Sequence, residues 1–346
     1  MAEHFLSSMS LGAGRPSALA AVVLAPMTGI SDVVFRRLAY RFGAGLVVTE
    51  MVAADAYVRG VEEARLRAEG EGVSPHTVQL VGRDPARMAE AARLAEAAGA
   101  DLLDINMGCP AKRVTGGLAG SALMREPDLA LRIVAAVVRA VAVPVTVKMR
   151  LGWDDLSLNA AELARRAEAE GVALVTVHGR TRAQFYKGRA DWAAVAAVKR
   201  AVRIPLVVNG DCTSAADARA MLAASGADAV MIGRAAVGRP WLVGGIAEAL
   251  RSGVLPPAPG LAARREAALD HFDALLSLFG AAQGNRHARK HLVAYADHLG
   301  AEVGDAGGRS AILALRAGMA TSDDHRATRR MLGQLFDVSA GMGWAA

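Results

Sequence analysis

The stretch Asp101–Pro110, with the sequence DLLDINMGCP, decides how the rest of this chain is interpreted. Its first half, Asp101–Ile105, predicts a short buried strand because apolar residues dominate it. Gly108 and Pro110 then end the strand, since glycine loosens the backbone and proline removes an N–H donor. Cys109 therefore lies on a loop after a strand, where α/β barrels carry their chemistry. A single cysteine is more often a small buried apolar residue, so the surrounding sequence has to decide.

Short apolar runs alternate with alanine-rich helical patterns on both sides of this stretch. The expected strands are Val22–Ala25, Leu46–Thr49, Thr77–Val81, Leu102–Ile105, Val145–Met149, Leu174–Val177, Leu206–Val208 and Ala229–Ile232. About eight strands alternating with helices over roughly 250 residues predict an α/β fold, a (β/α)8 TIM barrel. The alternative is a doubly wound open sheet, which usually carries GxGxxG after its first strand. This chain has Ala25–Gly29, APMTG, at that place, which favours the barrel.

The chain changes character after the last expected strand. Ser252–Gly260, SGVLPPAPG, predicts a linker because it is rich in proline and glycine. The expected organisation is a barrel domain at 1–251, a linker at 252–260 and an all-helical domain at 261–346. Five histidines of the helical domain lack a Cys or Glu partner pattern, so no metal is predicted. They are His271, His287, His291, His298 and His325.

Bulk properties bound the cell compartment and the partners. Two cysteines in 346 residues make no disulfide framework, which indicates a reducing, cytoplasmic location. The apolar run Ala18–Ala25 is too short to span a bilayer, so no membrane association is expected. The net charge of +6 permits a polyanionic partner such as nucleic acid without requiring one.

Polar residues stand at the ends of most expected strands. In a barrel the carboxyl ends of the strands face the mouth, where polar residues are typical of functional sites. The candidates are Gln79, Asn106, Cys109, Lys148, Arg150, His178, Asn209, Gly210, Asp211, Gly233 and Arg234. Lys148 is the sharpest of them, because a buried lysine is costly unless an anion meets its charge.

The last two strand ends suggest a phosphate site. In barrels the loops after the seventh and eighth strands bind phosphate through backbone N–H groups. Gly210 and Gly233 allow close approach there, and Arg234 offers a bidentate contact. A phosphate-bearing cofactor with Lys148 near its ring fits flavin mononucleotide (FMN), whose reduced form carries negative charge.

Seven motifs, in order along the chain, carry a resemblance to a known family. They are Ala25–Gly29, Val78–Leu80, Asn106–Lys112, Val147–Arg150, His178–Thr181, Asn209–Asp211 and Ile232–Arg234. Together they resemble the bacterial tRNA-dihydrouridine synthases, which are flavin-dependent, and most closely the subgroup of nitrogen-regulation-related proteins. The helical tail resembles the RNA-binding domain of that family through Arg289–His291, where the match is thinner.

The resemblance implies the chemistry and the roles. It implies NADPH-dependent, FMN-mediated reduction of the uracil 5,6 double bond in specific tRNA uridines, with hydride from the reduced flavin and a proton from Cys109. Asn106 would help to orient the reacting ring, and the uridine must be flipped out of the tRNA. The implied FMN contacts are Pro26, Met27 and Thr28 through backbone, with Gln79, Lys148, His178, Asn209, Gly210, Asp211, Gly233 and Arg234.

Basic residues give candidate tRNA contacts. Arg286, Arg289 and Lys290 share one helical face, at spacings i, i+3 and i+4, although a solvated face is the plainer interpretation. Lys112 and Arg180 lie on loops at the expected mouth, and Lys112–Gly120 is expected to be a mobile loop. In Arg180–Trp192 the aromatic residues could stack on RNA bases or simply pack the loop down.

Two other functions stay open at this stage. The first is an FMN-dependent oxidoreductase of a free pyrimidine, of the dihydroorotate or dihydropyrimidine type, which leaves the helical tail and basic mouth unexplained. The second is a non-enzymatic RNA-binding protein, which leaves Lys148 in its strand without a reason. Cys212 is expected to pack without chemistry.

Overall fold

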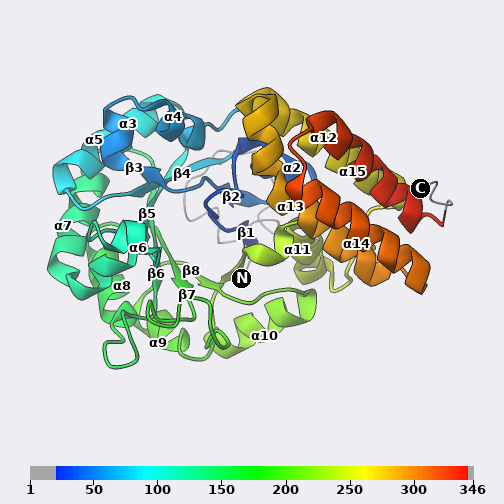
Figure 1. The fold of residues 1–346 in the computed structure, drawn as a ribbon. Helices are drawn as coiled ribbons and strands as arrows, with labels where there is room; N and C mark the ends of the chain where they lie inside the picture. Colours follow the sequence, from blue (N-terminus) through cyan, green and yellow to red (C-terminus); the bar gives the residue numbers. More distant parts are fainter. Residues whose placement is uncertain (1–20, 342–346) are drawn as a thin grey trace. The chain divides into compact units, whose positions relative to one another are not determined.

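The computed structural model describes residues 21–341, and it divides into two compact units (Figure 1). Residues 1–20 of the expected barrel domain and 342–346 of the expected helical domain lie outside this range. The first unit contains the residues up to Gly233 together with Val243–Pro256, and the second contains Arg234–Leu242 and the residues from Pro257 onward. The sequence-based division placed Arg234–Leu242 in the barrel domain. This segment instead groups with the helical unit, and nothing in its composition marks that change.

The first unit is a closed parallel barrel, which confirms the predicted fold class. Its strands, in chain order, are β1 (Val22–Leu24), β2 (Leu46–Val48), β4 (His76–Val81), β5 (Leu102–Met107), β6 (Val145–Arg150), β7 (Leu174–His178), β8 (Leu206–Asn209) and β9 (Ala229–Ile232). Each strand pairs in parallel with its neighbours, and pairings of β1 with β9 and of β2 with β4 close the ring. The short strand β3 (Val52–Ala53) adds to β4 outside this ring.

Helices surround the strands (Figure 1). They are α2 (Val33–Arg41), α3 (Ala54–Val58), α4 (Glu62–Ala68), α5 (Pro85–Ala97), α6 (Lys112–Thr115), α7 (Pro127–Val138), α8 (Ala160–Ala169), α9 (Ala196–Ala201), α10 (Ala215–Ser225) and α11 (Leu242–Ser252), with the 3-10 turn η2 (Gly120–Arg125). A further 3-10 turn, η3 (Arg234–Ala236), belongs to the second unit. Local chemistry sets several starts: the Asp84 carboxylate caps α5, whose first residue is Pro85.

Three local predictions are corrected by the structure. The sequence offers Ser31 as a candidate cap for the first helix, but Asp32 caps α2 by accepting from the Phe35 N–H at 2.9 Å. The segment Lys112–Gly120, expected to be a loop, begins with the short helix α6. The sequence pattern also predicts a helix around Trp192–Val202, but α9 begins only at Ala196.

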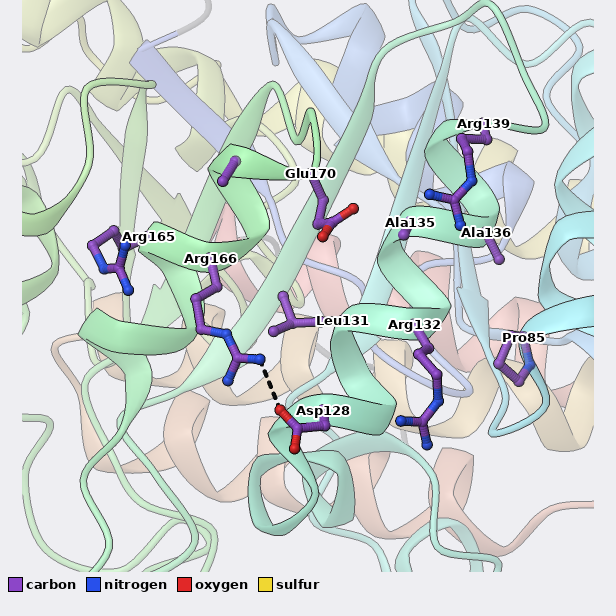
Figure 2. A pocket seen from close by; sticks show the side chains of 11 residues that line it. Pro85, Asp128, Leu131, Arg132, Ala135, Ala136, Arg139, Arg165, Arg166 and Glu170 are labelled. Carbon is purple, nitrogen blue, oxygen red and sulfur yellow. Dashed lines mark hydrogen bonds and ion pairs between the residues drawn. The ribbon is translucent and has the colours of Figure 1, made fainter.

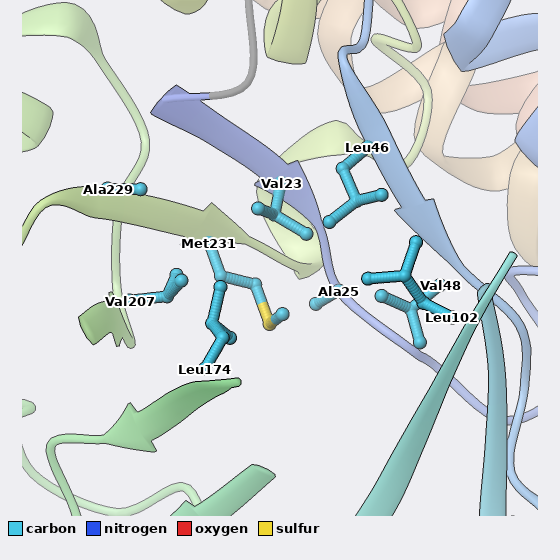
Figure 3. Close-up of a cluster of buried hydrophobic side chains, with 9 residues drawn as sticks. All are labelled: Val23, Ala25, Leu46, Val48, Leu102, Leu174, Val207, Ala229 and Met231. Carbon is cyan, nitrogen blue, oxygen red and sulfur yellow. The ribbon is translucent and has the colours of Figure 1, made fainter. Parts of the chain in front are cut away.

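The interior of the barrel is apolar at its base (Figure 3). The buried cluster there comprises Val23, Ala25, Leu46, Val48, Leu102, Leu174, Val207, Ala229 and Met231. A cavity of only about 20 Å³ adjoins this cluster, and Thr77, Asp104, Thr146 and Thr176 also line it. Side chains of a strand alternate between its two faces, so the residue two positions further along each strand also points inward. On β5, β7 and β8 this next residue is polar, namely Asp104, Thr176 and Asn209.

The second unit is built around four helices, α12 (Leu261–Phe279), α13 (Ala281–Glu302), α14 (Ala306–Thr321) and α15 (His325–Ser339). Their buried faces carry apolar side chains such as Phe272, Leu292, Leu315 and Phe336. Two of the histidines noted in the sequence, His271 and His291, are part of this core, with ring centroids 4.5 Å apart. Burial lowers the pKa of His271 to about 3, so its imidazole is neutral and packs as a core residue.

Candidate active site

Five neighbouring strands of the barrel each place one polar side chain in the layer nearest the mouth. These residues, which we call the mouth layer, are Gln79, Asn106, Lys148, His178 and Asn209. Strand pairing places Asn106 opposite Lys148 and His178 opposite Asn209, and hydrogen bonds join Gln79 to Asn106 and Lys148 to Asn209. All of them were predicted from the sequence as site residues. The barrel thus brings together groups that are up to 130 positions apart in the chain, Gln79 and Asn209.

Lys148 is the charged member of the mouth layer. Its Nζ donates to Asn209 Oδ1 at 3.2 Å, and the Asn209 amide is fixed in turn by its own donation to the Met231 carbonyl at 2.8 Å. Burial lowers the pKa of Lys148 to about 8, with the positive charge of Arg150 as a further cause. Within residues 21–341 no carboxylate lies within ion-pair distance of this ammonium group. The arrangement leaves Lys148 ready to meet an anionic ligand.

The loop that carries Cys109 is held on both sides of the thiol. Asn106 Oδ1 accepts from the backbone N–H of Cys109 at 2.9 Å and from that of Gly108 at 3.1 Å. The Cys109 carbonyl accepts from the Ser121 hydroxyl at 2.9 Å. Gly120 packs so closely that an added Cβ would lie 2.9 Å from this carbonyl oxygen, and its φ of +60° also favours glycine. Cys109 itself is partly exposed, and the backbone that carries its thiol is held in place.

Arg150, at the end of β6, joins this loop to the one after β7. Its Nε donates to the Gly108 carbonyl at 2.8 Å, and its Nη1 donates to the Thr181 and Phe185 carbonyls, each at 2.9 Å. The side chain is buried, 1% exposed. The sequence marked Arg150 as a polar strand end but gave it no role, because its partners are backbone atoms of distant loops.

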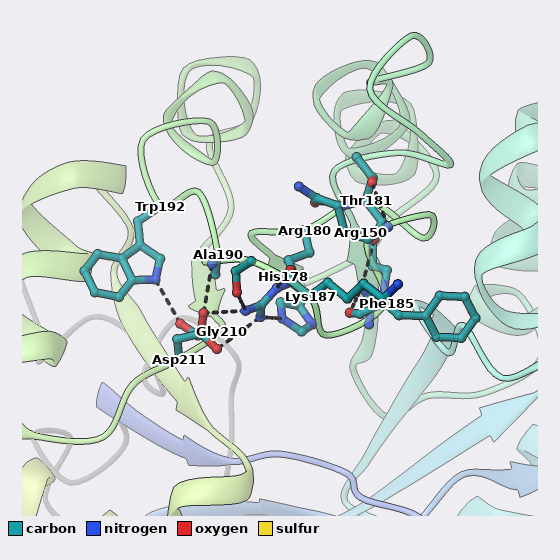
Figure 4. Close-up of polar contacts among 12 residues, drawn as sticks. Arg150, His178, Arg180, Thr181, Phe185, Lys187, Ala190, Trp192, Gly210 and Asp211 are labelled. Carbon is teal, nitrogen blue, oxygen red and sulfur yellow. Dashed lines mark hydrogen bonds and ion pairs between the residues drawn. The ribbon is translucent and has the colours of Figure 1, made fainter.

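The loop after β7 is organised by a buried ion pair (Figure 4). Arg180 lies 2.6 Å from Asp211, and it also donates to the Lys187 and Gly188 carbonyls at 3.1 and 2.7 Å. Arg180 was predicted to contact tRNA. The structure corrects this prediction, since only 2% of its side chain is exposed and its donors are taken up inside the protein. Asp211, predicted to bind FMN, uses its carboxylate on Arg180 and on the Ala190 N–H.

Replacing Asp211 by asparagine is expected to destabilise the barrel unit by about 1–2 kcal/mol. The substitution leaves the buried Arg180 charge without its counter-ion, and solvent access to Asp211 moderates the loss. Urea unfolding of both proteins measures the difference. The matched control is Asp128→Asn, which breaks the exposed ion pair with Arg166 and should shift the unfolding midpoint much less. Equal shifts for the two variants would show that the Arg180–Asp211 pair contributes no more to stability than an exposed ion pair does.

The remaining predicted FMN contacts lie on loops at the ends of strands. Pro26, Met27 and Thr28 follow β1, where the Met27 N–H is already bound to the Ser31 hydroxyl at 2.8 Å. The Met27 N–H is therefore not available for a backbone contact to FMN, while Thr28 is exposed. Gly210 follows β8 with a φ of +122°, and Gly233 follows β9. Arg234 begins η3, in the second unit.

The predicted tRNA contacts differ in exposure. Lys112 on α6 is exposed, as are Arg286 and Lys290 on α13. Arg289 is not equivalent to them, because its Nη2 donates to the Ser322 carbonyl at 3.0 Å and pairs with Asp323 at 2.7 Å. The structure therefore gives Arg289 a role in joining α13 to the end of α14.

The two aromatic residues after β7 have different environments. The Phe185 ring lies against the Arg182 guanidinium, whose carbon is 4.8 Å from the ring centroid, and it is only partly exposed. The Tyr186 ring is 54% exposed and lies near Arg150, at 5.6 Å. Of the two interpretations of this loop, packing therefore suits Phe185, and stacking on a base remains open to Tyr186.

A large hollow lies outside the barrel, between α7 and α8 (Figure 2). It has a volume of about 680 Å³ and four arginines line it, Arg132, Arg139, Arg165 and Arg166. Acidic groups offset part of this charge, since Arg166 pairs with Asp128 at 2.7 Å and Arg165 pairs with Glu162 at 2.8 Å. No residue of the mouth layer borders this hollow.

Residues 21–341 contain neither a metal-binding cluster nor a membrane-spanning helix. No group of three or more His, Cys, Asp or Glu side chains in this range is arranged to hold a metal ion. None of its helices is both long enough and apolar enough to cross a bilayer.

Solved structures share the barrel at low sequence identity. A complex of 2-naphthoyl-CoA reductase has a TM-score of 0.51 at 13% identity and covers 67% of this chain. Histamine dehydrogenase from Rhizobium sp. 4-9 has a TM-score of 0.50, also at 13% identity, and covers 73%. The chain spans about half of each of these longer proteins, 50% and 48%. At such identities the likeness establishes the fold alone.

Sequence comparisons are much closer. The family model for dihydrouridine synthase (Dus) matches residues 23–304. A probable tRNA-dihydrouridine synthase of Rhizobium leguminosarum is 51% identical over 92% of this chain and 96% of its own length, and one of Rhodobacter capsulatus is 50% identical over 91% and 94%. A tRNA-dihydrouridine synthase B of Xanthomonas campestris is 50% identical over 80% and 84%. Since the family model covers most of the chain and the relatives are aligned along it, this protein belongs to the dihydrouridine synthase family.

Proposed function

We propose that this protein reduces the 5,6 double bond of uracil in specific uridines of tRNA, as a flavin-dependent tRNA-dihydrouridine synthase. The observation that carries the proposal is the partly exposed Cys109 thiol, whose loop is fixed by Asn106 of the mouth layer. Family membership and the names of the relatives at about 50% identity support the same activity. Because tRNA is a cytoplasmic molecule in bacteria, the proposal also places the protein in the cytoplasm.

The mouth layer suits a flavin. The pyrimidine edge of the flavin ring presents carbonyl oxygens and an N–H, and the amides of Gln79 and Asn209 can complement both. Lys148 uses one of its three N–H donors on Asn209, which leaves two for an electron-rich ring edge. His178, Gly210 and Gly233 lie at the neighbouring strand ends, as expected for contacts to the rest of FMN. When bound, the flavin supplies the hydride, with NADPH as its proposed reductant.

The residues of this chain supply the proton and the geometry. Hydride addition at carbon 6 of uracil builds up negative charge on carbon 5 and on the oxygen of the neighbouring carbonyl at carbon 4. Cys109 Sγ donates its proton to carbon 5, and the resulting thiolate regains a proton from solvent. Asn106 holds the backbone of this acid in place through the Gly108 and Cys109 N–H groups. A general acid positioned in this way contributes about 10²–10⁴-fold to a rate.

The RNA contacts are proposed from charge and exposure. A uridine has to leave the stacked tRNA to reach a barrel mouth, so the protein must hold the surrounding phosphates. Lys112 is exposed three residues after Cys109, where it can meet the backbone next to the target. Arg286 and Lys290 are exposed on α13, and we propose that the helical unit binds tRNA through them.

A cofactor and substrate test decides between this function and its alternatives. The purified protein is loaded with FMN, reduced with dithionite without oxygen, and mixed with unmodified tRNA, free uridine or orotate. We expect tRNA alone to reoxidise the flavin and to gain dihydrouridine, with binding that weakens as salt rises. Reoxidation by a free pyrimidine but not by tRNA would reject the proposed substrate. A protein that binds no FMN would reject the enzyme.

A further inference from the structure

A chain of hydrogen bonds runs from the middle of the barrel to the Cys109 loop. Asp104 Oδ2 accepts from Gln79 Nε2 at 2.6 Å, and Gln79 Oε1 accepts from Asn106 Nδ2 at 2.8 Å. Asn106 Oδ1 then accepts from the Gly108 and Cys109 N–H groups. Asp104 is thus the inner end of a path whose outer end is the backbone of the residue that carries the thiol.

The chemistry at the inner end gives this path a direction. Asp104 Oδ2 accepts from the NH₂ group of Gln79, which is the group of this amide that an acceptor requires. The Gln79 oxygen then faces Asn106, whose NH₂ group donates to it. The Asn106 oxygen is left for the two backbone N–H groups, which can only donate. Turning either amide around would place two donors or two acceptors face to face.

Asp104 is itself firmly held. It lies inside the barrel, 4% exposed, and its Oδ1 accepts from the Thr146 hydroxyl at 2.6 Å. Burial raises the pKa of Asp104, while the bonds from Gln79 and Thr146 and the charge of Lys148 oppose that rise. In the described part of the chain no Arg or Lys forms an ion pair with it. Burying a carboxylate with only amide and hydroxyl donors as its partners lowers the stability of the fold. Its presence therefore indicates a role that offsets this loss.

We infer that Asp104 is a positioning residue, which sets the direction of the Gln79 and Asn106 amides and thereby holds the loop of Cys109. Its effect on proton transfer rests on the proposed function, whereas its effect on the loop does not. The loop is therefore the better readout, and the exchange of its backbone N–H groups with deuterium reports directly on the two bonds to Asn106.

The test compares three residues of similar size at position 104. Asp104→Asn keeps a neutral acceptor, and Asp104→Leu removes the acceptor altogether. We expect the Gly108 and Cys109 N–H groups to exchange about threefold faster with asparagine and about tenfold faster with leucine, in the order of acceptor strength. Mass spectrometry of peptides spanning 106–110 measures these rates in the full-length protein. If the leucine variant does not fold, the exchange rate of the asparagine variant alone still tests the inference.

Thr146→Val is the matched control. It also removes one hydrogen bond to the Asp104 carboxylate, but on the oxygen that does not face Gln79. Exchange at Gly108 and Cys109 should then stay as in the unchanged protein, even if the barrel loses stability. Equal exchange with Asp, Asn and Leu at position 104 would overturn the inference. So would a Thr146→Val variant that exchanges as fast as the leucine variant, because general loosening would then explain the result. A protein without the proposed activity still gives this measurement.

Discussion

Replacing Cys109 by alanine is expected to slow dihydrouridine formation by about 10²–10⁴-fold while leaving the bound flavin in place. The thiol is the proposed proton donor, and alanine has no proton to give. Within residues 21–341 the Cys109 Sγ makes no hydrogen bond, and the loop is held through its backbone by Asn106 and Ser121. Anaerobic mixing of the FMN-loaded, dithionite-reduced protein with unmodified tRNA measures the rate, and the dihydrouridine content of the tRNA is determined at each time.

The other cysteine provides the control. Cys212 is buried, its Sγ contacts the Ser214 carbonyl at 3.7 Å, and burial raises the pKa of this thiol to about 12. Cys212→Ala should therefore form dihydrouridine at the rate of the unchanged protein. A Cys109→Ala variant that is no slower than Cys212→Ala would remove the thiol from the mechanism and leave another group as the acid.

The sequence was most informative where a residue type conflicted with its surroundings. Lys148 stands in an apolar strand, and a closed barrel has no edge to which a lysine could reach, so a ligand role was the natural inference. The same reasoning applies to Asp104, which interrupts the apolar run Leu102–Ile105. The apolar pattern alone assigns Asp104 no role, because it predicts a buried strand for the stretch as a whole. A charge inside a strand was thus a sufficient signal for both residues.

Contacts between distant loops were out of reach for the sequence. Arg180 reads as an exposed basic residue at the mouth, and only the pairing of neighbouring strands reveals Asp211 as its partner, 31 positions away. Arg289 reads as part of a basic helical face, but the end of α14 folds back onto it, 33 positions along the chain. The charge pattern of one segment therefore fails to predict the exposure of a side chain when another segment supplies its counter-ion or a carbonyl acceptor.

Replacing Lys148 by methionine is expected to weaken FMN binding by about 10–100-fold, since it removes charged hydrogen bonds from the ring edge. The lowered pKa of about 8 adds a pH dependence. FMN favours the protonated lysine, so the affinity of the unchanged protein should fall as pH rises through about 8. The stability of the flavin-free protein should change in the opposite sense. Unfolding returns Lys148 to its usual pKa of 10.5, so the unfolded state binds more protons between about 8 and 10.5 and the free energy of unfolding rises with pH.

Two titrations of the same protein separate these effects. FMN fluorescence gives the dissociation constant at each pH, and urea unfolding gives the stability without flavin. Both pH slopes should be lost in Lys148→Met. They should persist in Lys199→Met. Lys199 pairs with Asp228 at 2.7 Å and is not part of the mouth layer. Matching slopes in the two variants would mean that another group titrates in this range. Opposite slopes that depend on Lys148 alone would show that protonated Lys148 lowers the stability of the flavin-free barrel and strengthens the binding of FMN.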